Sequence, residues 1–369
     1  MYKLPVEREE HAAAEAHWRA QLRGAITDLA GLERILTLSP SERAGVEHAV
    51  RGGFPISITP YYASLIAEGD PACPIRRQCV PSASEAVDVP GDLRDPLGEE
   101  ANEVAAHLVQ RYPDRALLIA TDRCSVYCRF CTRSRMVGNG GGTRSLASLE
   151  PAFSYLRAHP EVQEVIVSGG DPLVMASERI ASLLQRLAEI DSIGNVRVAS
   201  RTPVTLPQRI TAELCRALRS HPSVWLMTHF NHPRELSDEA RRACAMLVDH
   251  GIPVMNHTVL LRGVNDRAEI LEQLFRGLVR ARVRPYYLLQ ADPVRGTGHL
   301  RTKLEVGLQI MASLQGRLSG LALPKFIVDT PNGRGKVPVG SNYIVASGAG
   351  VTTLQTFRGE LVDYIDPPS

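Results

Sequence analysis

Short apolar runs rich in β-branched residues alternate with longer helix-like segments from about residue 115 onward. The runs cover residues 116–121, 164–168, 196–200, 224–228, 252–259 and 285–290. The helix-like segments between them include residues 177–190, 210–220, 237–249 and 268–281. This alternation is typical of βα units whose strands are parallel. Six units are too few for a complete eight-stranded barrel, so the pattern predicts an incomplete barrel of the α/β class.

The residues before this region are predicted to be mainly helical. An Ala-, Glu- and Arg-rich stretch over residues 11–22 contains Trp18, and Ser39 followed by a proline is typical of a helix start. A Pro-, Gly- and Asp-rich stretch from residue 68 to residue 100 has little periodicity, which predicts an extended connection or arm. We therefore expect a helical N-terminal region and arm over residues 1–110.

The rest of the chain is predicted to form a barrel and a C-terminal segment. We expect the partial barrel over residues 111–310 and the C-terminal segment over residues 311–369. Residues 304–318 have a helical pattern, and residues 326–329 have the pattern of a strand. This strand runs into a Gly-rich loop that carries Lys336.

The composition excludes several classes of protein. The 369 residues are 44% hydrophobic, which is enough for a sizeable core. The formal net charge of +2 is close to neutral, so we expect neither a nucleic acid nor a membrane as partner. No run of about 18 apolar residues could span a bilayer, and the charged N-terminus lacks the apolar core of a signal peptide. These features predict a cytoplasmic protein.

Three of the seven cysteines, Cys124, Cys128 and Cys131, lie in one loop with the spacing C-x3-C-x2-C. The loop follows the first predicted strand, at the end where α/β barrels carry their chemistry. A cubane iron–sulfur cluster usually has four cysteine ligands, so three leave one iron open to another ligand. Zinc is the alternative, but it needs a fourth ligand, and the next histidine, His159, lies beyond a helix-like segment. An odd cysteine count argues against a disulfide framework, and we interpret the other four cysteines as ordinary thiols.

Phe130 stands between the second and third cysteines of this loop. With this aromatic residue, the loop resembles the signature of the radical S-adenosylmethionine superfamily. The resemblance implies a (βα)6 TIM-like barrel, a [4Fe–4S] cluster on the three cysteines, and S-adenosylmethionine on the open iron. An aromatic residue at this position can shield the cluster and line an adenine pocket.

The run Ser168, Gly169, Gly170 and Asp171 closes the second predicted strand. Read alone, it could be a plain strand-to-helix turn. Two glycines let the backbone approach a ligand closely, and Asp171 can accept hydrogen bonds from an ammonium group. In the superfamily that the loop resembles, a Gly-rich segment at this strand end holds the methionyl amino group. We therefore predict that these four residues contact S-adenosylmethionine.

Lysine is rare in this chain. Of 42 basic residues, the lysines are Lys3, Lys303, Lys325 and Lys336. A buried lysine with a lowered pKa can form a Schiff base with pyridoxal phosphate. The alternative for Lys336 is a solvent-exposed loop residue, which is the usual position of lysine.

A longer resemblance favours the cofactor lysine. Residues from about 55 to 365 resemble lysine 2,3-aminomutase and its relatives. The matching stretches are residues 58–62, 111–115, 124–135, 200–203, 228–233, 259–266 and 324–338. The resemblance implies that Lys336 binds pyridoxal phosphate, and that Arg111, Tyr112 and Arg115 contact it with the arginines on its phosphate. Guanidinium groups suit phosphate because they are planar and permanently charged.

The same resemblance implies the contacts to the substrate. Arg133, just past the cysteines, corresponds to the residue that holds the α-carboxylate of lysine. Asp292 and Asp329 correspond to two aspartates that hold the distal ammonium, although each alone could be a turn cap or a surface acid. The presence of both acids favours a substrate with a cationic side chain.

Three further residues, Arg201, His229 and His257, are expected near S-adenosylmethionine by the same resemblance. His257 stands where the lysine enzyme has glutamine. Arg295 lies close to Asp292 in the sequence, so we expect it to offset part of the charge of that acid.

The resemblance therefore predicts a radical S-adenosylmethionine, pyridoxal-phosphate-dependent 2,3-aminomutase that moves the α-amino group of a basic amino acid to Cβ, with L-lysine as first choice. Arginine and a protein-bound or conjugated lysine are alternatives, and a non-catalytic iron–sulfur protein is a remote one. An external one-electron reductant of the flavodoxin or ferredoxin type is implied as a partner. The chain ends at Ser369 without the cysteine-rich tail that binds zinc in the lysine enzyme, so we expect a homo-oligomer, a dimer or tetramer, without bridging zinc.

Overall fold

The computed structural model describes residues 5–367, with side chains from residue 13 onward. Its centre is a ten-stranded sheet in which the strands follow one another in chain order. The seven parallel strands are β3 (Arg115–Thr121), β4 (Glu164–Gly169), β5 (Asn195–Ala199), β6 (Val224–Thr228), β7 (Val254–Leu260), β8 (Arg284–Gln290) and β9 (Lys325–Thr330). Antiparallel strands extend both edges: β1 (Glu103–Ala105) and β2 (Leu108–Tyr112) on one side, and β10 (Gly335–Pro338) on the other. The sheet is therefore a barrel that remains open between β1 and β10.

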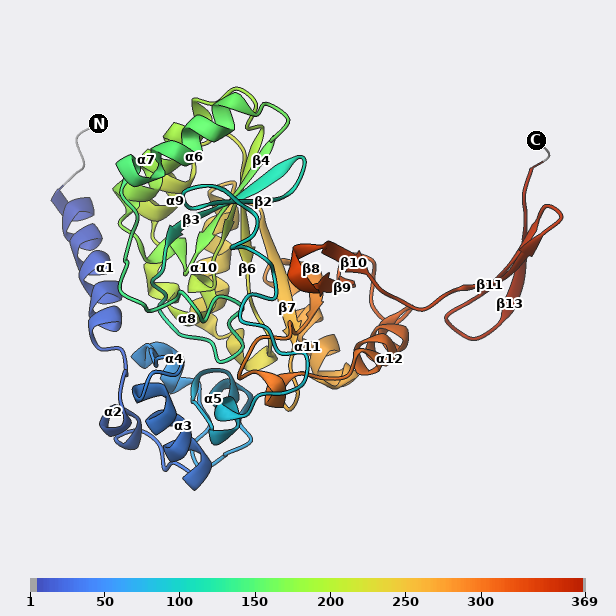
Figure 1. Ribbon diagram of the computed structural model, residues 1–369, viewed down its shortest axis with the longest axis horizontal. Helices are drawn as coiled ribbons and strands as arrows, with labels where there is room; N and C mark the ends of the chain where they lie inside the picture. The colour runs from blue at the N-terminus through green and yellow to red at the C-terminus, as the bar shows by residue number, and fades with distance from the viewer. Residues whose placement is uncertain (1–4, 368–369) are drawn as a thin grey trace.

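Helices follow the barrel strands in chain order, which confirms the six expected βα units (Figure 1). They are α6 (Leu146–Ala158), α7 (Ser177–Ala188), α8 (Thr202–Thr205), α9 (Ala212–Leu218), α10 (Asp238–Asp249), α11 (Ala268–Arg280) and α12 (Leu304–Leu314). Each long helix turns an apolar face toward the sheet, because its apolar residues recur at helical spacing. In α11, for example, the buried residues are Leu271, Leu274, Phe275 and Leu278.

Alternate residues of the barrel strands face opposite sides of the sheet. In β4, Val165 and Val167 are buried in the main hydrophobic core, whereas Ile166 between them lines a central cavity. Arg197 takes the same inward position in β5. The outward faces of the strands thus form the core with the helices, and the inward faces leave room for small molecules.

Five helices precede the sheet: α1 (Pro5–Arg23), α2 (Leu29–Glu33), α3 (Pro40–Val50), α4 (Pro60–Ser64) and α5 (Pro74–Cys79). The predicted helix start at Ser39 is confirmed, because its hydroxyl accepts a hydrogen bond from the backbone N–H of Glu42, and the Glu42 carboxylate accepts one from the N–H of Ser39. Helix α1 lies along the outside of the barrel, and α2 to α5 form a lobe at its lower end (Figure 1).

Two features of the first part of the chain differ from the prediction. The hairpin of β1 and β2 lies where helix or connection was expected, because Leu108, Val109 and Tyr112 read equally well as parts of either. The stretch over residues 68–100 is not wholly extended, since it contains α5 and the short helix η1 (Ala83–Ala86). Residues 110 and 310, at which we proposed to divide the chain, lie inside β2 and α12.

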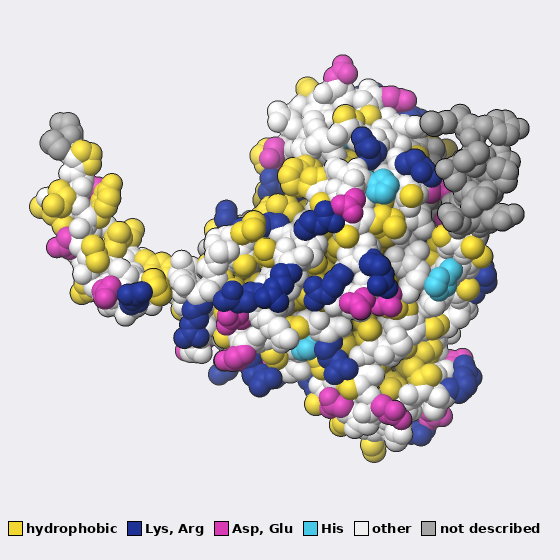
Figure 2. Space-filling model, turned by 180° about the vertical axis from the view of Figure 1, so that it is seen from behind, with side chains coloured by type: hydrophobic (Ala, Val, Ile, Leu, Met, Phe, Trp, Pro, Cys, Tyr) yellow, Lys and Arg dark blue, Asp and Glu magenta, His cyan; other side chains and the backbone are white. Residues whose placement is uncertain are grey.

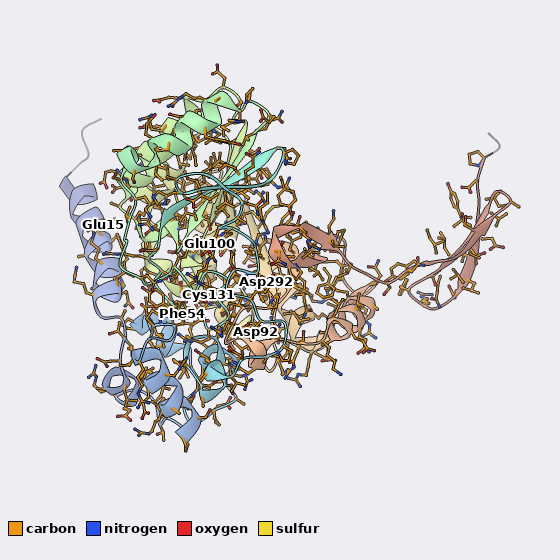
Figure 3. All side chains as sticks on the ribbon, viewed as in Figure 1. Glu15, Phe54, Asp92, Glu100, Cys131 and Asp292 are labelled. Carbon is orange, nitrogen blue, oxygen red and sulfur yellow. The ribbon has the colours of Figure 1, made fainter. Side chains whose placement is uncertain are left out.

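Residues 88–100, here called the strap, pass the segments that follow β8 and β9 and then lead into β1. They therefore join the two open edges of the sheet. The backbone N–H of Leu93 donates to the carbonyl oxygen of Pro293 at 2.8 Å, and the N–H of Asn332 donates to that of Pro96 at 2.9 Å. In the view of Figure 3, Asp92 and Glu100 of the strap lie on either side of Cys131 and Asp292. The strap therefore contacts the segments just after β8 and β9.

Three short strands form a separate sheet at the C-terminal end: β11 (Ile344–Gly348), β12 (Val351–Gln355) and β13 (Leu361–Ile365). This sheet, here called the arm, projects far from the barrel (Figure 1). Hydrophobic side chains are visible along it (Figure 2), and the exposed ones include Ile344, Leu361, Tyr364 and Ile365. Residues 5–367 contain no helix that is both long and apolar enough to cross a bilayer.

Candidate active site

The inside of the open barrel is a cavity of about 820 Å³. All eighteen residues that the sequence nominated for cofactor or substrate contacts line this cavity. They come from β2, the start of β3, the cysteine loop after β3, the middle of β7, the carboxyl ends of β4, β5, β6 and β8, and the β9–β10 pair. Their shared location is a structural finding, whereas the role of each one stays a prediction.

The cysteine loop is held by the backbone of the N-terminal lobe. The N–H of Tyr127 donates to the carbonyl of Ser57 at 2.9 Å, and the N–H of Arg129 donates to that of Gln78 at 2.9 Å. All seven cysteines are free thiols, and those outside the loop, Cys73, Cys79, Cys215 and Cys244, are buried. The loop thus presents its three sulfurs to the cavity from a fixed backbone.

Burial raises the pKa of the Cys131 thiol to about 12 and that of Cys124 well above its usual range. Such thiols become thiolates when a metal binds them. Within residues 13–367, no group of three or more Cys, His, Asp or Glu side chains surrounds a single metal ion. A cubane cluster does not need such a group, because each cysteine binds a different iron. The donor set therefore fits a cluster with three protein ligands.

The two glycines at the end of β4 allow the backbone that leads into the cysteine loop to pack directly against this strand end. Gly169 has φ +128°, and a Cβ on it would collide with the carbonyl oxygen of Thr121. A Cβ on Gly170 would collide with the carbonyl of Arg123, one residue before the first cysteine. The sequence suggested that these glycines admit a ligand. The structure shows that they admit the start of the cysteine loop.

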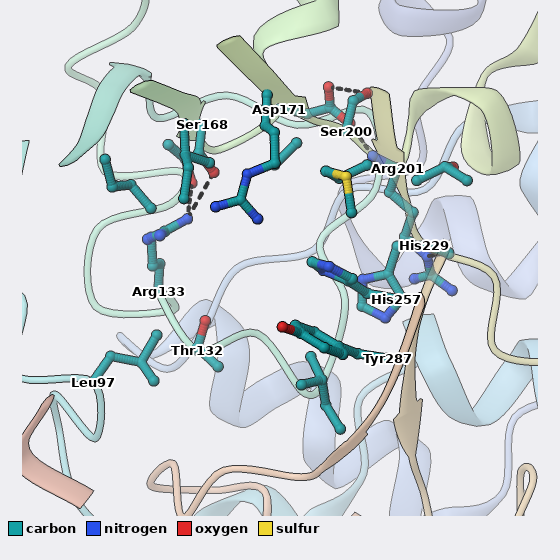
Figure 4. Close-up of a pocket in the computed structure, with 18 of the residues that line it drawn as sticks. Leu97, Thr132, Arg133, Ser168, Asp171, Ser200, Arg201, His229, His257 and Tyr287 are labelled. Carbon is teal, nitrogen blue, oxygen red and sulfur yellow. Dashed lines mark hydrogen bonds between the residues drawn. The ribbon is translucent and has the colours of Figure 1, made fainter. Parts of the chain in front are cut away.

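The Asp171 carboxylate is hydrogen-bonded to donors of the chain itself. It accepts from the Ser200 hydroxyl at 2.6 Å, from the N–H of Arg201 at 2.8 Å and from the N–H of Leu173 at 3.0 Å (Figure 4). Burial raises the pKa of Asp171, and these hydrogen bonds oppose that rise. Asp171 therefore joins the ends of β4 and β5 beside the cysteine loop.

Arg201, at the end of β5, contacts a cysteine sulfur directly. Its Nη1 lies 2.8 Å from the Sγ of Cys128. Its Nη2 lies 2.7 Å from the carboxylate of Glu235 and 2.5 Å from the side-chain oxygen of Gln78. The guanidinium is buried, with 8% of the side chain exposed. The sequence placed Arg201 near S-adenosylmethionine, and in the structure most of its donors are occupied by the protein.

Two neutral histidines lie in the middle of the cavity (Figure 4). Burial, together with the charges of Lys336 and Arg197, lowers the pKa of His257 to about 3. Its ring stacks near that of Tyr287 at 5.5 Å, and its buried Nε2 has no hydrogen-bond partner. Burial and the charge of Arg201 lower the pKa of His229 well below its usual value. An unpartnered Nε2 in a cavity is an open position for a polar group of a bound molecule.

Glu99 of the strap is a site residue that the sequence analysis missed. Its carboxylate contacts Arg133, with Nε at 2.8 Å and Nη2 at 2.7 Å from Oε1. Nη1 of Arg133 donates to the Ser168 hydroxyl at 3.0 Å and to the carbonyl of Gly169 at 3.2 Å (Figure 4). A guanidinium has five N–H donors, so about one remains for a bound carboxylate. Because Glu99 lies in an aperiodic stretch, only its acidic type could have pointed to Arg133.

Burial alone would raise the pKa of Glu99, but the guanidiniums of Arg133 and Arg135 outweigh it and lower that pKa to about 2. Arg135 lies 3.0 Å from Glu99 and 3.2 Å from Asp95. The strap and the segment after the cysteines are thus joined by a buried ion-pair network.

A second charged group occupies the wall formed by β2, β9 and β10. Lys336 lies on β10, not in a loop as expected, and its Nζ forms an ion pair with Asp329. Asp329 also pairs with Arg111 at 3.3 Å. The neighbouring Asp292 is buried, and burial and the charge of Asp329 raise its pKa to about 7. The wall therefore holds two acids, one of them close to half-protonated at neutral pH.

The structure also gives the contacts of four further residues that the sequence analysis named. Arg115 lies with its guanidinium 3.7 Å from the centre of the Tyr112 ring, and the Tyr112 hydroxyl accepts from the N–H of Lys336 at 2.8 Å. Arg295 is exposed and pairs with Asp88 at 2.7 Å, so the expected compensation of Asp292 is wrong. Phe130 packs edge-on against His229 with ring centres 5.5 Å apart.

These features agree with the families that the sequence matches. Residues 118–274 match the radical SAM superfamily, and the chain is a radical S-adenosylmethionine enzyme. Residues 311–369 match the family described as lysine-2,3-aminomutase. The L-lysine 2,3-aminomutase of Clostridium subterminale is 43% identical over 95% of this chain and 84% of that protein, so the chain belongs to the lysine 2,3-aminomutase family. This membership confirms the expected isomerase class, [4Fe–4S] cluster and S-adenosylmethionine, and it agrees with the expected pyridoxal phosphate.

Other relatives differ from one another in the amino acid on which they act. The L-lysine 2,3-aminomutase of Bacillus subtilis is 39% identical over 95% of this chain and 74% of its own. The glutamate 2,3-aminomutase of Clostridioides difficile is 38% identical over 96% of this chain and 83% of its own. Among solved structures, a radical SAM methyltransferase from Sphaerobacter thermophilus has a TM-score of 0.45 at 22% identity, covering 60% of this chain and 68% of its own.

Proposed function

We propose that this enzyme moves the α-amino group of a basic amino acid, with L-lysine first, to the β-carbon, and that it uses pyridoxal phosphate on Lys336. The observation that carries the proposal is the presence of Asp292 and Asp329 in the same cavity as Lys336 and Arg133. An amino acid bound there has a guanidinium for its carboxylate and two acids for a cationic side chain.

The residues present fit the cofactors of this reaction. When bound, the cluster with S-adenosylmethionine supplies the radical that starts the reaction, and pyridoxal phosphate binds the nitrogen that migrates. The side chain of Lys336 is 29% exposed, and this amine belongs to the cavity wall. Arg111 and Arg115 belong to the same wall and offer permanent positive charge to a phosphate.

Asp329 is suited to exchange one cation for another. In the structure it pairs with Lys336. A lysine nitrogen that is engaged by the cofactor no longer neutralises this acid. The cationic end of a substrate can then take the place of Lys336 beside Asp329, while Arg111 keeps its own contact with this acid at 3.3 Å.

Binding of a cationic side chain is also coupled to the protonation state of Asp292. With a pKa of about 7, the acid is protonated in roughly half of the molecules at neutral pH. A cationic side chain favours the ionised carboxylate, so its binding releases that proton to solvent. The neutral imidazoles of His229 and His257 add no charge to the cavity, which preserves the preference for a cation at the two acids.

Arginine is the second candidate substrate, because the same pair of acids accepts a guanidinium. Glutamate, named for one relative, is disfavoured because its side-chain carboxylate would meet Asp292 and Asp329. A protein-bound or conjugated lysine remains an alternative that free amino acids test directly.

The proposed partners follow from the same reasoning. The cluster needs an external one-electron reductant, of the flavodoxin or ferredoxin type. The exposed hydrophobic residues of the arm support a homo-oligomer, either a dimer or a tetramer without bridging zinc. A cytoplasmic location agrees with this chemistry.

The test is anaerobic incubation of the reconstituted enzyme with S-adenosylmethionine, pyridoxal phosphate and a strong reductant. L-lysine, L-arginine and L-glutamate are supplied separately, and the products are separated by chiral chromatography. We expect a β-amino isomer from L-lysine. Turnover of glutamate alone, or of none of the three, would contradict the proposed substrate class.

A further inference from the structure

Arg201 contacts both a cysteine of the loop and a buried acidic network, which suggests a role beyond ligand binding. We propose that Arg201 is a positioning residue that raises the reduction potential of the cluster through its contact with Cys128. The inference rests on the proposed assignment of the three loop cysteines as cluster ligands.

The contact has the geometry of a hydrogen bond to sulfur. The Nη1 of Arg201 lies 2.8 Å from the Sγ of Cys128, and the guanidinium donates because it has no acceptor atom. The Arg201 guanidinium also lies 5.3 Å from the centre of the Phe130 ring, which belongs to the same loop. The charge of Arg201 therefore lies close to two residues of the cysteine loop.

Protein partners hold the guanidinium in this orientation. Its Nε donates to the carbonyl of His229 at 3.1 Å. Its Nη2 meets the carboxylate of Glu235 at 2.7 Å, the side-chain oxygen of Gln78 at 2.5 Å and the hydroxyl of Tyr62 at 3.1 Å. After these contacts and the sulfur, about one of the five N–H groups remains. Arg201 therefore has little capacity left for another ligand.

Hydrogen bonds to sulfur and nearby charge are among the factors that set the potential of an iron–sulfur cluster. Reduction adds one electron from the external reductant, while the cysteine stays a thiolate and no proton is needed. A buried cation and an N–H donor at the sulfur stabilise that added negative charge. Glu235, with a fully buried side chain, acts in the opposite direction because it offsets the charge of Arg201.

Two substitutions should therefore shift the potential in opposite directions. Arg201→Met removes the charge and the donor, and Glu235→Gln removes the opposing charge at nearly constant shape. The measurement is an anaerobic redox titration of the reconstituted enzyme followed by electron paramagnetic resonance, with iron content as the check on assembly. We expect the ratio of reduced to oxidised cluster at a fixed potential to fall about tenfold in R201M, which is about 59 mV for one electron, and to rise in E235Q.

Arg209→Met is the matched control. Arg209 is fully buried and hydrogen-bonded to the carbonyls of Leu173 and Met175, and none of its hydrogen bonds is to a cysteine. Its loss should leave the potential unchanged even where it lowers stability. Arg201→Lys keeps the charge and should restore most of the potential lost in R201M.

The outcomes are decisive in each case. An unchanged or higher potential in R201M, or an unchanged or lower one in E235Q, would overturn the proposal. If R201M does not retain iron, the comparison of R201K, E235Q and wild type decides alone. A complete cluster in Cys128→Ala would instead refute the assignment of the ligands, which separates that failure from the failure of this inference.

Discussion

Lys336 and Asp329 occupy directly opposed positions on the antiparallel strands β10 and β9, and their side chains form an ion pair. The register of one strand pair thus sets the distance between the proposed cofactor lysine and a proposed substrate acid. A shift of one residue in this pairing would turn Lys336 to the other face of the sheet. The Tyr112 hydroxyl, which accepts from the N–H of Lys336 at 2.8 Å, supports this register from the opposite edge of the barrel.

Replacing Lys336 should remove covalent attachment of the cofactor. In Lys336→Ala we expect that borohydride treatment no longer fixes pyridoxal phosphate to the protein, as measured by intact mass, and that turnover is lost. Iron content should stay unchanged, because the partners of Lys336 are Asp329 and Tyr112 and not the cysteine loop. Lys325→Ala at the exposed start of β9 is the matched control and should retain the label. A label that persists in Lys336→Ala would assign the cofactor to another lysine.

Asp292 should make binding of a basic amino acid dependent on pH. Its pKa is raised to about 7, so the protonated form, which binds a cation poorly, predominates below that value. We expect KM for lysine to fall as pH rises through about 7, and Asp292→Asn to abolish this dependence and raise KM by about tenfold to a hundredfold.

The control for this prediction is Asp88→Asn, which removes an exposed acid paired with Arg295. Its KM profile should match that of the wild type. A profile in Asp292→Asn that still changes near neutral pH would show that another group controls binding.

Glu99 should stabilise the fold through its buried pairs with Arg133 and Arg135. Breaking such a pair by removing one partner costs about 3–5 kcal/mol, so Glu99→Gln should lower the free energy of unfolding by about that amount. Glu100→Gln is the control, because Glu100 is 59% exposed and surface pairs contribute about 0–1 kcal/mol. Urea unfolding at pH 7 measures both. Equal small effects would mean that the buried network contributes little.

The same residue gives a prediction for acid. The pKa of Glu99 is about 2 in the folded protein and 4.5 without the fold, so its contribution is complete above about 4.5 and is lost as pH falls toward 2. The difference in unfolding free energy between wild type and Glu99→Gln should therefore shrink over this interval. A constant difference down to low pH would contradict the lowered pKa.

Gly170 should be required for the cysteine loop to keep its position. A Cβ there would collide with the backbone carbonyl of Arg123, so Gly170→Ala must displace the loop or the end of β4. We expect a loss of about 1–3 kcal/mol in stability and a lower iron content after reconstitution. Gly194→Ala is the control, because the nearest atom to a Cβ there is 3.9 Å away. Normal iron content in Gly170→Ala would show that the loop can adjust.

Much of the barrel could be predicted because its signals are local. Alternation of apolar runs and helical segments predicts βα units. Each of the six expected runs lies within, or overlaps, one of the strands β3 to β8. The spacing of the three loop cysteines likewise predicts an iron–sulfur cluster from residues that are close together in the sequence. Parallel strands bring their carboxyl ends together, so residues such as Asp171 and Arg201 meet without any long-range signal in the sequence.

The remaining features depend on contacts that no local pattern contains. Glu99 meets Arg133 only because the strap crosses from one edge of the sheet to the other, and a polar stretch without periodicity does not reveal its path. The position of Lys336 on a strand was hidden by the glycines around it, which indicate a loop. The hydrogen bonds that Asp171 makes within the chain could not be predicted either, because a strand-end acid serves equally well as a cap and as a ligand.

The projecting arm has a consequence for how the protein behaves on dilution. Three short strands without a covering layer are only marginally stable in water, and most of their side chains are exposed. The amide protons of β11 to β13 should therefore exchange rapidly in any species that leaves the arm uncovered, while those of β4 to β7 stay protected. Exchange rates in the arm, compared across protein concentrations, thus report assembly independently of turnover.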